Sequence, residues 1–384
     1  MAALFTIAIV KSRFCHGRLA WRGHIRTTHE TESDDVLYCF PDLRDSCPRA
    51  HKQTIIRVVM YMFMLATILV TVFGNLLVII SICHFKQLQS PTNFIILSLA
   101  CVDCFLGSLV LPYSMMRSVE GCWYLGQAVC TLHSGLDMTL SVASILHLCL
   151  VAVDRHWAIC DPLRYGIKVT TSTVACGIGI IWLFSFTFSF CVLLSKVNLV
   201  GMEAFIQNEC VGTCLLIFNK QWGVIVSLVA FFVPGTVMSL LYLKIFYVAR
   251  RHAQSISDRF TAPSAPQASE QRERKAAKTL AFVMGVFLVC WLPFFITTIV
   301  DPFLGFSTPY SVFDALVWFG YFNSTCNPLI YGFFYPRFQK AFKMIVSRYV
   351  FFHTADSHTL VPPPIWKKAL HHMGLHRQNK VKVK

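Results

Sequence analysis

The chain has 384 residues, of which 55% are hydrophobic and 14% are charged; its mean hydropathy is +0.57 and its formal net charge is +15. This composition excludes a disordered, a collagen-like or an ordinary water-soluble protein, since soluble domains contain about 25% charged residues. Apolar runs extend over most of the chain, which a bilayer explains and a single packed core does not.

The N-terminal segment is predicted to be a tail. Its first ten residues are apolar and precede Lys11 and Arg13, so a signal peptide is an alternative with an unfavourable pattern, since a signal peptide places its positive charges first. Residues 14–50 are polar and predict disorder, and we assign residues 1–54 to an extracellular tail.

The middle of the chain contains seven stretches that are long and apolar enough to cross a bilayer as helices, which takes roughly 20 residues each. They are Val58–Cys83, Phe94–Met116, Val129–Val153, Val169–Ser195, Gln221–Leu243, Thr279–Val300 and Ala315–Pro336. The sequence therefore predicts an all-α membrane protein, a seven-transmembrane helix bundle, in a domain of residues 55–350.

Charge and composition of the connections predict their side of the membrane. Positive residues are retained in the cytoplasm, and the connections on one side hold 22 Lys and Arg against 12 on the other, which favours an external N-terminus. Arg250–Arg274 predicts a flexible cytoplasmic loop, and residues 351–384 predict a basic cytoplasmic tail. The basic charge thus lies beside the membrane, so we expect anionic lipid or an acidic protein as partner, and no nucleic acid.

Two carboxylates lie inside the predicted spans, where an ionisable group indicates a functional site. Asp137 lies 18 residues before Arg155 on the third span, which is five helical turns or about 27 Å, so both face one side at opposite ends. A carboxylate near the external end suits a cationic amine, held by a charge-assisted hydrogen bond in a low dielectric. A purely structural ion pair is the weaker interpretation of Asp137.

Aromatic side chains of the sixth and seventh spans would surround a cation bound at Asp137. They are Trp291, Phe294, Phe295, Trp318 and Tyr321. Tyr321 can also donate a hydrogen bond that fixes the carboxylate. Without Asp137 these rings would predict ordinary packing.

Asp103 lies midway along the second span, with Asn75, Ser144, Asn323 and Asn327 as possible partners. Such a polar cluster is typical either of a sodium or water site that couples helix movements or of a satisfied hydrogen-bond network. Both interpretations stay open, and no other cofactor or metal is expected.

Other residues indicate movement near the cytoplasmic side. Asp154 can hold the neighbouring Arg155, and its release would free a donor for a partner; the alternative is an interfacial arginine that reaches toward water. Pro112, Pro234, Pro293 and Pro328 lie in the spans, where they permit hinges or simply shape the bundle.

Motifs in six of the spans, and one that closes the third, resemble the rhodopsin-like G-protein-coupled receptors in identity and in order. They are Gly74-Asn75, Leu99–Asp103, Asp154-Arg155-His156, Trp182, Phe231–Pro234, Cys290–Pro293 and Asn327–Tyr331. Four further segments resemble the trace amine-associated receptors, in particular the subtype-4-like branch. These are His84–Leu88, Ser90–Phe94, Asp161–Tyr165 and Asn323–Pro328.

The resemblance implies a role for each matching residue. Asp137 is expected to be the amine counter-ion, Trp291 the switch under the ligand, and Asp103 with Asn327 the sodium pair. Arg155 and Tyr331 are expected to rearrange and admit a heterotrimeric G protein. Disulfides are implied between Cys130 and Cys214 and between Cys47 and Cys210, and the other cysteines are expected to be small core residues.

The implied function is a plasma-membrane receptor that binds small amines and raises cyclic AMP through a stimulatory G protein, in olfactory neurons. The fifth span has Val226, Ser227 and Ala230 where some relatives carry an acid. Ser227 is therefore expected to contact the ligand without adding a second charge, which favours small primary amines of the phenylethylamine type.

Two departures from the family pattern concern the cytoplasmic side. His156 stands where the family usually has tyrosine, with modest expected effect. Arg337 replaces a tryptophan before the short cytoplasmic amphipathic helix that the resemblance implies near residues 336–347, which puts its anchoring in question.

Other functional classes fit the sequence less well. An aminergic neurotransmitter-type receptor is the alternative within the receptor class. An organic-cation transporter also uses a mid-bundle carboxylate but shows broken helices and inverted repeats, and none is evident. An enzyme is not expected, since no catalytic set shares one face and His133 and His147 are isolated.

Overall fold

The computed structural model describes residues 37–49, 52–203, 210–257 and 266–355, and this part of the chain is helical. Its α-helices are α2 (Thr54–His84), α3 (Pro91–Phe105), α4 (Leu111–Glu120), α5 (Gly126–Cys160), α6 (Pro162–Lys168), α7 (Thr171–Leu194), α9 (Lys220–Ser227), α10 (Val233–Ser257), α11 (Pro266–Val300), α12 (Tyr310–Phe334) and α13 (Pro336–Ala355). Shorter 3-10 turns are η1 (Lys86–Leu88), η3 (Val197–Leu199) and η5 (Asp301–Leu304), and π turns are η2 (Leu106–Val110) and η4 (Leu228–Phe232).

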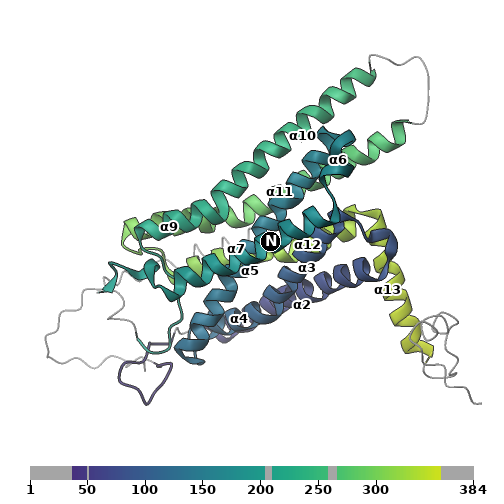
Figure 1. Cartoon of the computed structure of the whole chain (residues 1–384). Coiled ribbons are helices and arrows are strands. Elements are labelled where there is room, and N and C mark those ends of the chain that lie inside the picture. Colours follow the sequence, from purple (N-terminus) through teal and green to yellow (C-terminus); the bar gives the residue numbers. More distant parts are fainter. Residues whose placement is uncertain (1–36, 50–51, 204–209, 258–265, 356–384) are drawn as a thin grey trace, which may run out of the picture. The chain divides into compact units, whose positions relative to one another are not determined.

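The long helices lie alongside one another, with α5 in contact with α3, α7 and α10, while α2 and α11 both contact α12 (Figure 1). Three of the helices begin at an N-cap residue. Its side-chain oxygen accepts a hydrogen bond from a backbone N–H group of the first turn that has no partner within the helix. Ser90 accepts from the Asn93 N–H over 3.4 Å, Thr170 from Thr173 over 3.2 Å, and Asn219 from Trp222 over 2.9 Å.

Six predicted spans are helices long and apolar enough to cross a membrane. The seventh, α12, has 25 residues, about 37 Å of helix, and is less apolar because it carries several buried polar side chains. These are Asp314, Asn323, Ser324, Thr325 and Asn327, which the bundle covers.

The four prolines of the spans act in two ways. Pro112 and Pro234 are each the second residue of a helix that directly follows a π turn. In the second and fifth spans the wider π turn thus comes just before a proline, which has no N–H to donate. Pro293 and Pro328 lie inside α11 and α12.

The predicted disorder of residues 14–50 is wrong for residues 37–49. Here the backbone pairs at Tyr38 with Pro48 and at Ser46 with Val211, and two disulfides hold the segment. We call Leu37–Arg49 the strap. Residues 1–36 lie outside the described ranges.

The predicted flexible loop Arg250–Arg274 is wrong over much of its length. Helix α10 continues to Ser257 and α11 already begins at Pro266, because good helix formers extend both helices beyond the apolar stretches. The helix after the seventh span is also longer than expected and runs to Ala355. The basic tail 356–384 and residues 258–265 lie outside the described ranges.

Helix α13 is anchored without the family tryptophan. Arg337 is exposed, and the neighbouring Phe338 is buried with its ring 5.6 Å from that of Tyr331 on α12. Ala341 and Phe338 belong to the same apolar cluster as Val78 of α2. The phenylalanine one position later therefore supplies the contact with the bundle.

Candidate functional site

Three disulfides lie at one end of the bundle, which we call the disulfide end. Two of them join Cys47 to Cys210 and Cys130 to Cys214, the pairs that the resemblance implies. The third joins Cys39 of the strap to Cys122. The expectation that the remaining cysteines are core residues is therefore wrong for these two.

An ionic cluster also fixes the strap at the disulfide end. Glu120, the last residue of α4, accepts hydrogen bonds from Arg57 over 2.6 Å and from the Tyr61 hydroxyl over 2.7 Å. Arg49 of the strap forms a further ion pair with the same carboxylate. One carboxylate thus joins the strap, α2 and α4.

A cavity opens between α4, α5, α9, α11 and α12 at the disulfide end, and Asp137 lines it. Tyr321 donates its hydroxyl hydrogen to Asp137 Oδ2 over 2.7 Å, and the Ser141 hydroxyl lies 3.5 Å from Oδ1. Asp137 takes part in none of the ion pairs within the described ranges. The carboxylate therefore faces the cavity without a direct ion-pair partner among the described residues, in the orientation that Tyr321 sets.

Aromatic rings form the deeper wall of this cavity. Trp291, Phe294 and Phe295 of α11 line it, and Phe295 stacks on Phe231 of η4 with ring centroids 4.8 Å apart. The Trp291 ring lies against Gly320 of α12, where an added Cβ would be 2.7 Å from the indole. Trp291 is thus clamped between α12 and the Phe295 ring.

Two residues assigned to ligand contacts from the sequence are not among the described residues that line the cavity. Trp318 instead donates its indole hydrogen to the Ser118 hydroxyl over 2.9 Å, because its side of α12 faces α4. Ser227 is fully buried at the end of α9.

The cavity contains two charged residues that the sequence reasoning missed, Arg117 and Asp314. Both lie just beyond the apolar stretches that defined the second and seventh spans, so they were counted with the connections. Asp314 accepts a hydrogen bond from Ser118 over 2.8 Å. The helical extension of α4 and α12 carries both residues inward.

Asp103 is fully buried and accepts three hydrogen bonds, from Ser144 over 3.2 Å, Ser324 over 2.7 Å and Asn327 over 2.7 Å. Ser324 was missed, although its position three residues before Asn327 places both on one face of α12. The cluster joins α3, α5 and α12.

The two other predicted partners of Asp103 lie elsewhere in the same region. Asn75 donates to the carbonyl oxygens of Thr71 and Ser324, over 2.9 and 3.2 Å. The side-chain oxygen of Asn323 is buried without a hydrogen-bond partner. Asn75 therefore reaches the cluster only through the Ser324 backbone.

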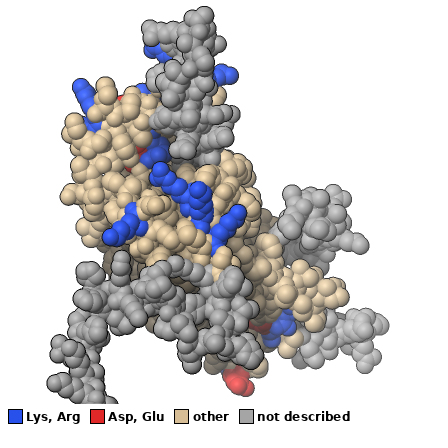
Figure 2. All heavy atoms as spheres, turned by 90° about the vertical axis from the view of Figure 1, so that its right-hand side faces the viewer, with Lys and Arg blue, Asp and Glu red and all other residues tan. Residues whose placement is uncertain are grey.

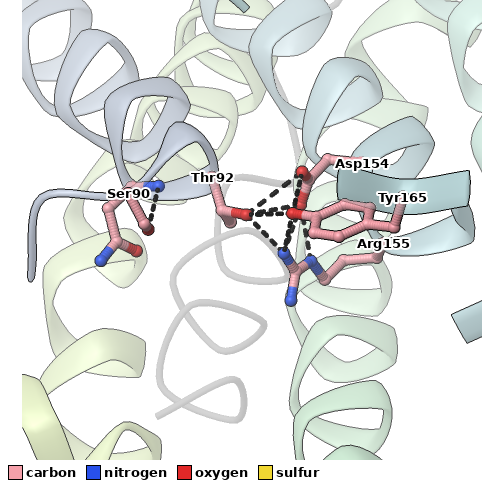
Figure 3. Close-up of polar contacts among 6 residues, drawn as sticks. Ser90, Thr92, Asp154, Arg155 and Tyr165 are labelled. Carbon is pink, nitrogen blue, oxygen red and sulfur yellow. Dashed lines mark hydrogen bonds and ion pairs between the residues drawn. The ribbon is translucent and has the colours of Figure 1, made fainter. Parts of the chain in front are cut away.

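At the opposite end of the bundle, which we call the Arg155 end, Arg155 is held in a polar cluster (Figure 3). Its Nε donates to Asp154 over 2.7 Å and its Nη2 to the Thr92 hydroxyl over 2.6 Å. Tyr165 of α6 donates to the other carboxylate oxygen of Asp154 over 2.9 Å. Burial raises the pKa of Tyr165, so this hydroxyl remains a donor.

Thr92 and Tyr165 were missed because their contacts join α3, α5 and α6, which no local pattern reveals. Tyr331 is buried on α12, and its ring contacts Tyr335 and Phe338. The Tyr331 ring therefore packs against the first turn of α13.

The Arg155 end is basic in the described part of the chain. Figure 2 looks onto this side of the molecule, and the charged side chains visible on it are mostly blue Lys and Arg, with few red Asp and Glu. Exposed basic residues here are Lys86, Arg164, Lys168, Lys244, Arg250, Arg337, Lys340 and Lys343. This surface suits acidic proteins and anionic lipid headgroups.

Comparison with known proteins places this arrangement in a family. Residues 74–331 match the family described as 7 transmembrane receptor (rhodopsin family). The chain is 46% identical to trace amine-associated receptor 4 of Mus musculus over 344 residues, which cover 88% of this chain and 99% of the relative. It is 48% identical to receptor 3 of Mus musculus over 339 residues (85% and 99%) and to receptor 2 of Homo sapiens over 307 residues (80% and 87%).

These matches confirm the predicted seven-span receptor fold, α12 being the seventh span. Relatives of subtypes 2, 3 and 4 are similar to the chain to nearly the same degree, so identity does not single out the subtype-4-like branch. The chain belongs to the trace amine-associated receptors of the rhodopsin family and is a multi-pass protein of the plasma membrane.

Proposed function

We propose that this receptor binds a small protonated amine at Asp137 and signals through a stimulatory or olfactory G protein that raises cyclic AMP. The observation that carries the proposal is the Asp137 carboxylate, which has no direct ion-pair partner among the described residues and is oriented by Tyr321 inside a cavity with an aromatic wall. The relatives are named trace amine-associated receptors, which agrees with an amine as ligand.

The residues of the cavity define the ligand's chemistry. Asp137 forms a charge-assisted hydrogen bond with the ammonium group, which is stronger than a neutral one. The rings of Trp291 and Phe294 are placed for cation–π attraction and for apolar contact with the rest of the ligand. A small primary amine with an aromatic body, of the phenylethylamine type, satisfies both requirements.

The switch in this proposal begins at Trp291. A ligand that presses on the indole moves α11 at Pro293, where the helix lacks one backbone hydrogen bond, and displaces the Phe295 ring that stacks on Phe231. The ligand stabilises the moved state only by the difference between its affinities for the two states. About 5.5 kcal/mol of such difference shifts a 1:99 population to 99:1.

At the Arg155 end, the same movement would release Arg155 from Asp154 and Thr92. The freed guanidinium and the adjacent basic surface would then contact the G protein. Anionic lipid headgroups would bind exposed basic residues at the edge of the same surface. In this proposal the Arg155 end lies in the cytoplasm and the disulfide end lies outside the cell.

We also propose that Asp103 holds a sodium ion when the receptor is inactive. Its carboxylate and the hydroxyl oxygens of Ser144 and Ser324 are the hard oxygen ligands that such an ion prefers, and they converge from three helices. Loss of the ion would let α12 shift against α3.

Replacing Asp137 by alanine tests the amine proposal. We expect Asp137→Ala to abolish the cyclic AMP response to 2-phenylethylamine while surface labelling of the intact receptor stays unchanged. Asp42→Ala removes an exposed carboxylate of the strap and should respond like the wild type. A full amine response in Asp137→Ala would contradict the proposal.

A further inference from the structure

The cavity of Asp137 also contains a basic side chain, Arg117, near the end of α4. Arg117 is the basic residue among the described side chains that line the cavity, and Asp314 of α12 is a second acid. The amine site proposed above uses only the charge of Asp137, so Arg117 and Asp314 have no role in it.

Arg117 has hydrogen-bond donors to spare. Its Nη1 donates to the Cys214 carbonyl oxygen over 3.3 Å, and the Tyr310 hydroxyl is a second hydrogen-bond partner of the guanidinium. Its Nε is buried and has no hydrogen-bond partner, and Arg117 belongs to none of the ion pairs in the described part of the chain. A guanidinium has five N–H donors in a planar fork, so several remain for an acceptor in the cavity.

Asp314 is engaged from the protein side. It accepts the Ser118 hydroxyl over 2.8 Å, and both Arg117 and Lys52 act on its charge. Lys52 itself is fixed by the carbonyl oxygens of Ser118 and Val119. A second ammonium group on the ligand would meet these two cations at Asp314, whereas an anionic group would meet the free donors of Arg117.

We propose that Arg117 determines ligand specificity, and that the preferred ligand carries a carboxylate as well as the ammonium group bound by Asp137, as an amino acid does. This inference rests on the proposed amine site. The carboxylate pairs with the Arg117 fork, and a ligand with no net charge leaves the balance among Asp137, Asp314, Arg117 and Lys52 unchanged.

Three related compounds test the proposal in cells that express the intact chain, with cyclic AMP as the readout. Phenylalanine has both charged groups, 2-phenylethylamine only the ammonium group, and N-acetylphenylalanine only the carboxylate. We expect the half-maximal concentration of phenylalanine to be at least about tenfold below that of 2-phenylethylamine, and N-acetylphenylalanine to be inactive.

Substitutions at Arg117 separate its role from general packing. Arg117→Gln should raise the half-maximal concentration of phenylalanine at least about tenfold and change that of 2-phenylethylamine by less than about threefold. Arg117→Lys keeps the charge but loses the planar fork, so an intermediate effect on phenylalanine alone is expected. Arg57→Gln makes the same exchange at the Glu120 cluster, outside the cavity lining, and should preserve the preference.

Several outcomes would overturn the assignment of Arg117. These are a wild-type receptor that responds to phenylalanine no better than to 2-phenylethylamine, or an Arg117→Gln variant in which both compounds lose potency by the same factor. If Arg117→Gln does not reach the surface, Arg117→Lys is used instead. A loss of potency for phenylalanine alone supports the assignment, and an equal loss for both compounds contradicts it. Failure of the amine site itself has a different signature, a full 2-phenylethylamine response in Asp137→Ala.

Discussion

The Tyr321 hydroxyl donates to Asp137 Oδ2 over 2.7 Å, and this bond connects α12 to α5 across the cavity. It fixes the rotamer of the carboxylate in the absence of ligand. Binding therefore loses less side-chain conformational entropy at Asp137. The bond also joins Asp137 directly to the helix that carries Asn327.

Tyr321→Phe should weaken amine binding without removing the charge. Losing one hydrogen bond to a carboxylate costs about 1–2 kcal/mol, which predicts a rise of about 5- to 30-fold in the half-maximal concentration of 2-phenylethylamine. Concentration–response curves for cyclic AMP measure this. Tyr113→Phe, an exposed tyrosine on α4, is the matched control. An unchanged curve in Tyr321→Phe would show that the bond does not orient Asp137.

Tyr165→Phe should raise signalling in the absence of ligand. Asp154 loses one of its donors, which weakens the cluster that holds Arg155 by about 0.5–1.5 kcal/mol and favours release up to about tenfold. Basal cyclic AMP, normalised to surface receptor, measures the effect. Tyr247→Phe removes an exposed hydroxyl from α10 and should leave basal signalling unchanged. Lower or equal basal signalling in Tyr165→Phe would contradict a restraining role.

Asp103→Asn should remove any dependence of the response on sodium. In the wild type, replacing sodium chloride by an equal concentration of N-methylglucamine chloride should make the amine more potent, because the proposed sodium ion would stabilise the inactive state. The amide lacks the negative charge that attracts the ion, so the two salts should give equal potency. Equal potency already in the wild type would eliminate the sodium proposal.

Replacing Cys39 and Cys122 together by serine should destabilise the receptor. The bridge closes a loop with a sequence separation of 83 residues, and such a bridge contributes about 2–4 kcal/mol. We expect a melting temperature lower by about 5 °C or more in purified receptor. Cys83→Ser removes an exposed free cysteine and serves as control. If the melting temperature of the double variant equals that of Cys83→Ser, the bridge does not stabilise the fold.

Hydropathy and charge predicted the spans because a bilayer imposes one simple rule on every crossing helix. The rule says nothing about residues at the membrane boundary. It therefore assigned Arg117 and Asp314 to the connections, although α4 and α12 extend beyond the apolar stretches and include both residues, which line the cavity. The Asp103 cluster was predictable in part, for Ser144 and Asn327, since both lie deep in spans, where polar side chains have few possible partners.

Contacts between short connecting segments were not predictable from patterns. Thr92 and Tyr165 meet only because α3 and α6 are both positioned against α5, and the bridge between Cys39 and Cys122 depends on where the strap runs. The location of both cysteines outside the predicted spans was a usable signal. It identifies the candidates for oxidation but not their pairing.

The spacing of the bridges along the chain sets an order for biosynthesis. Cys39 can pair once Cys122 has been made, but the partner of Cys47 comes 163 residues later in the chain. During that interval Cys47 lacks its native partner, although the strap that contains it can already be tethered at Cys39; in the proposed orientation it lies in a compartment that promotes oxidation. In a nascent receptor that stalls before the connection between the fourth and fifth spans is made, Cys47 therefore has no native partner. Quality control in the endoplasmic reticulum could recognise this cysteine.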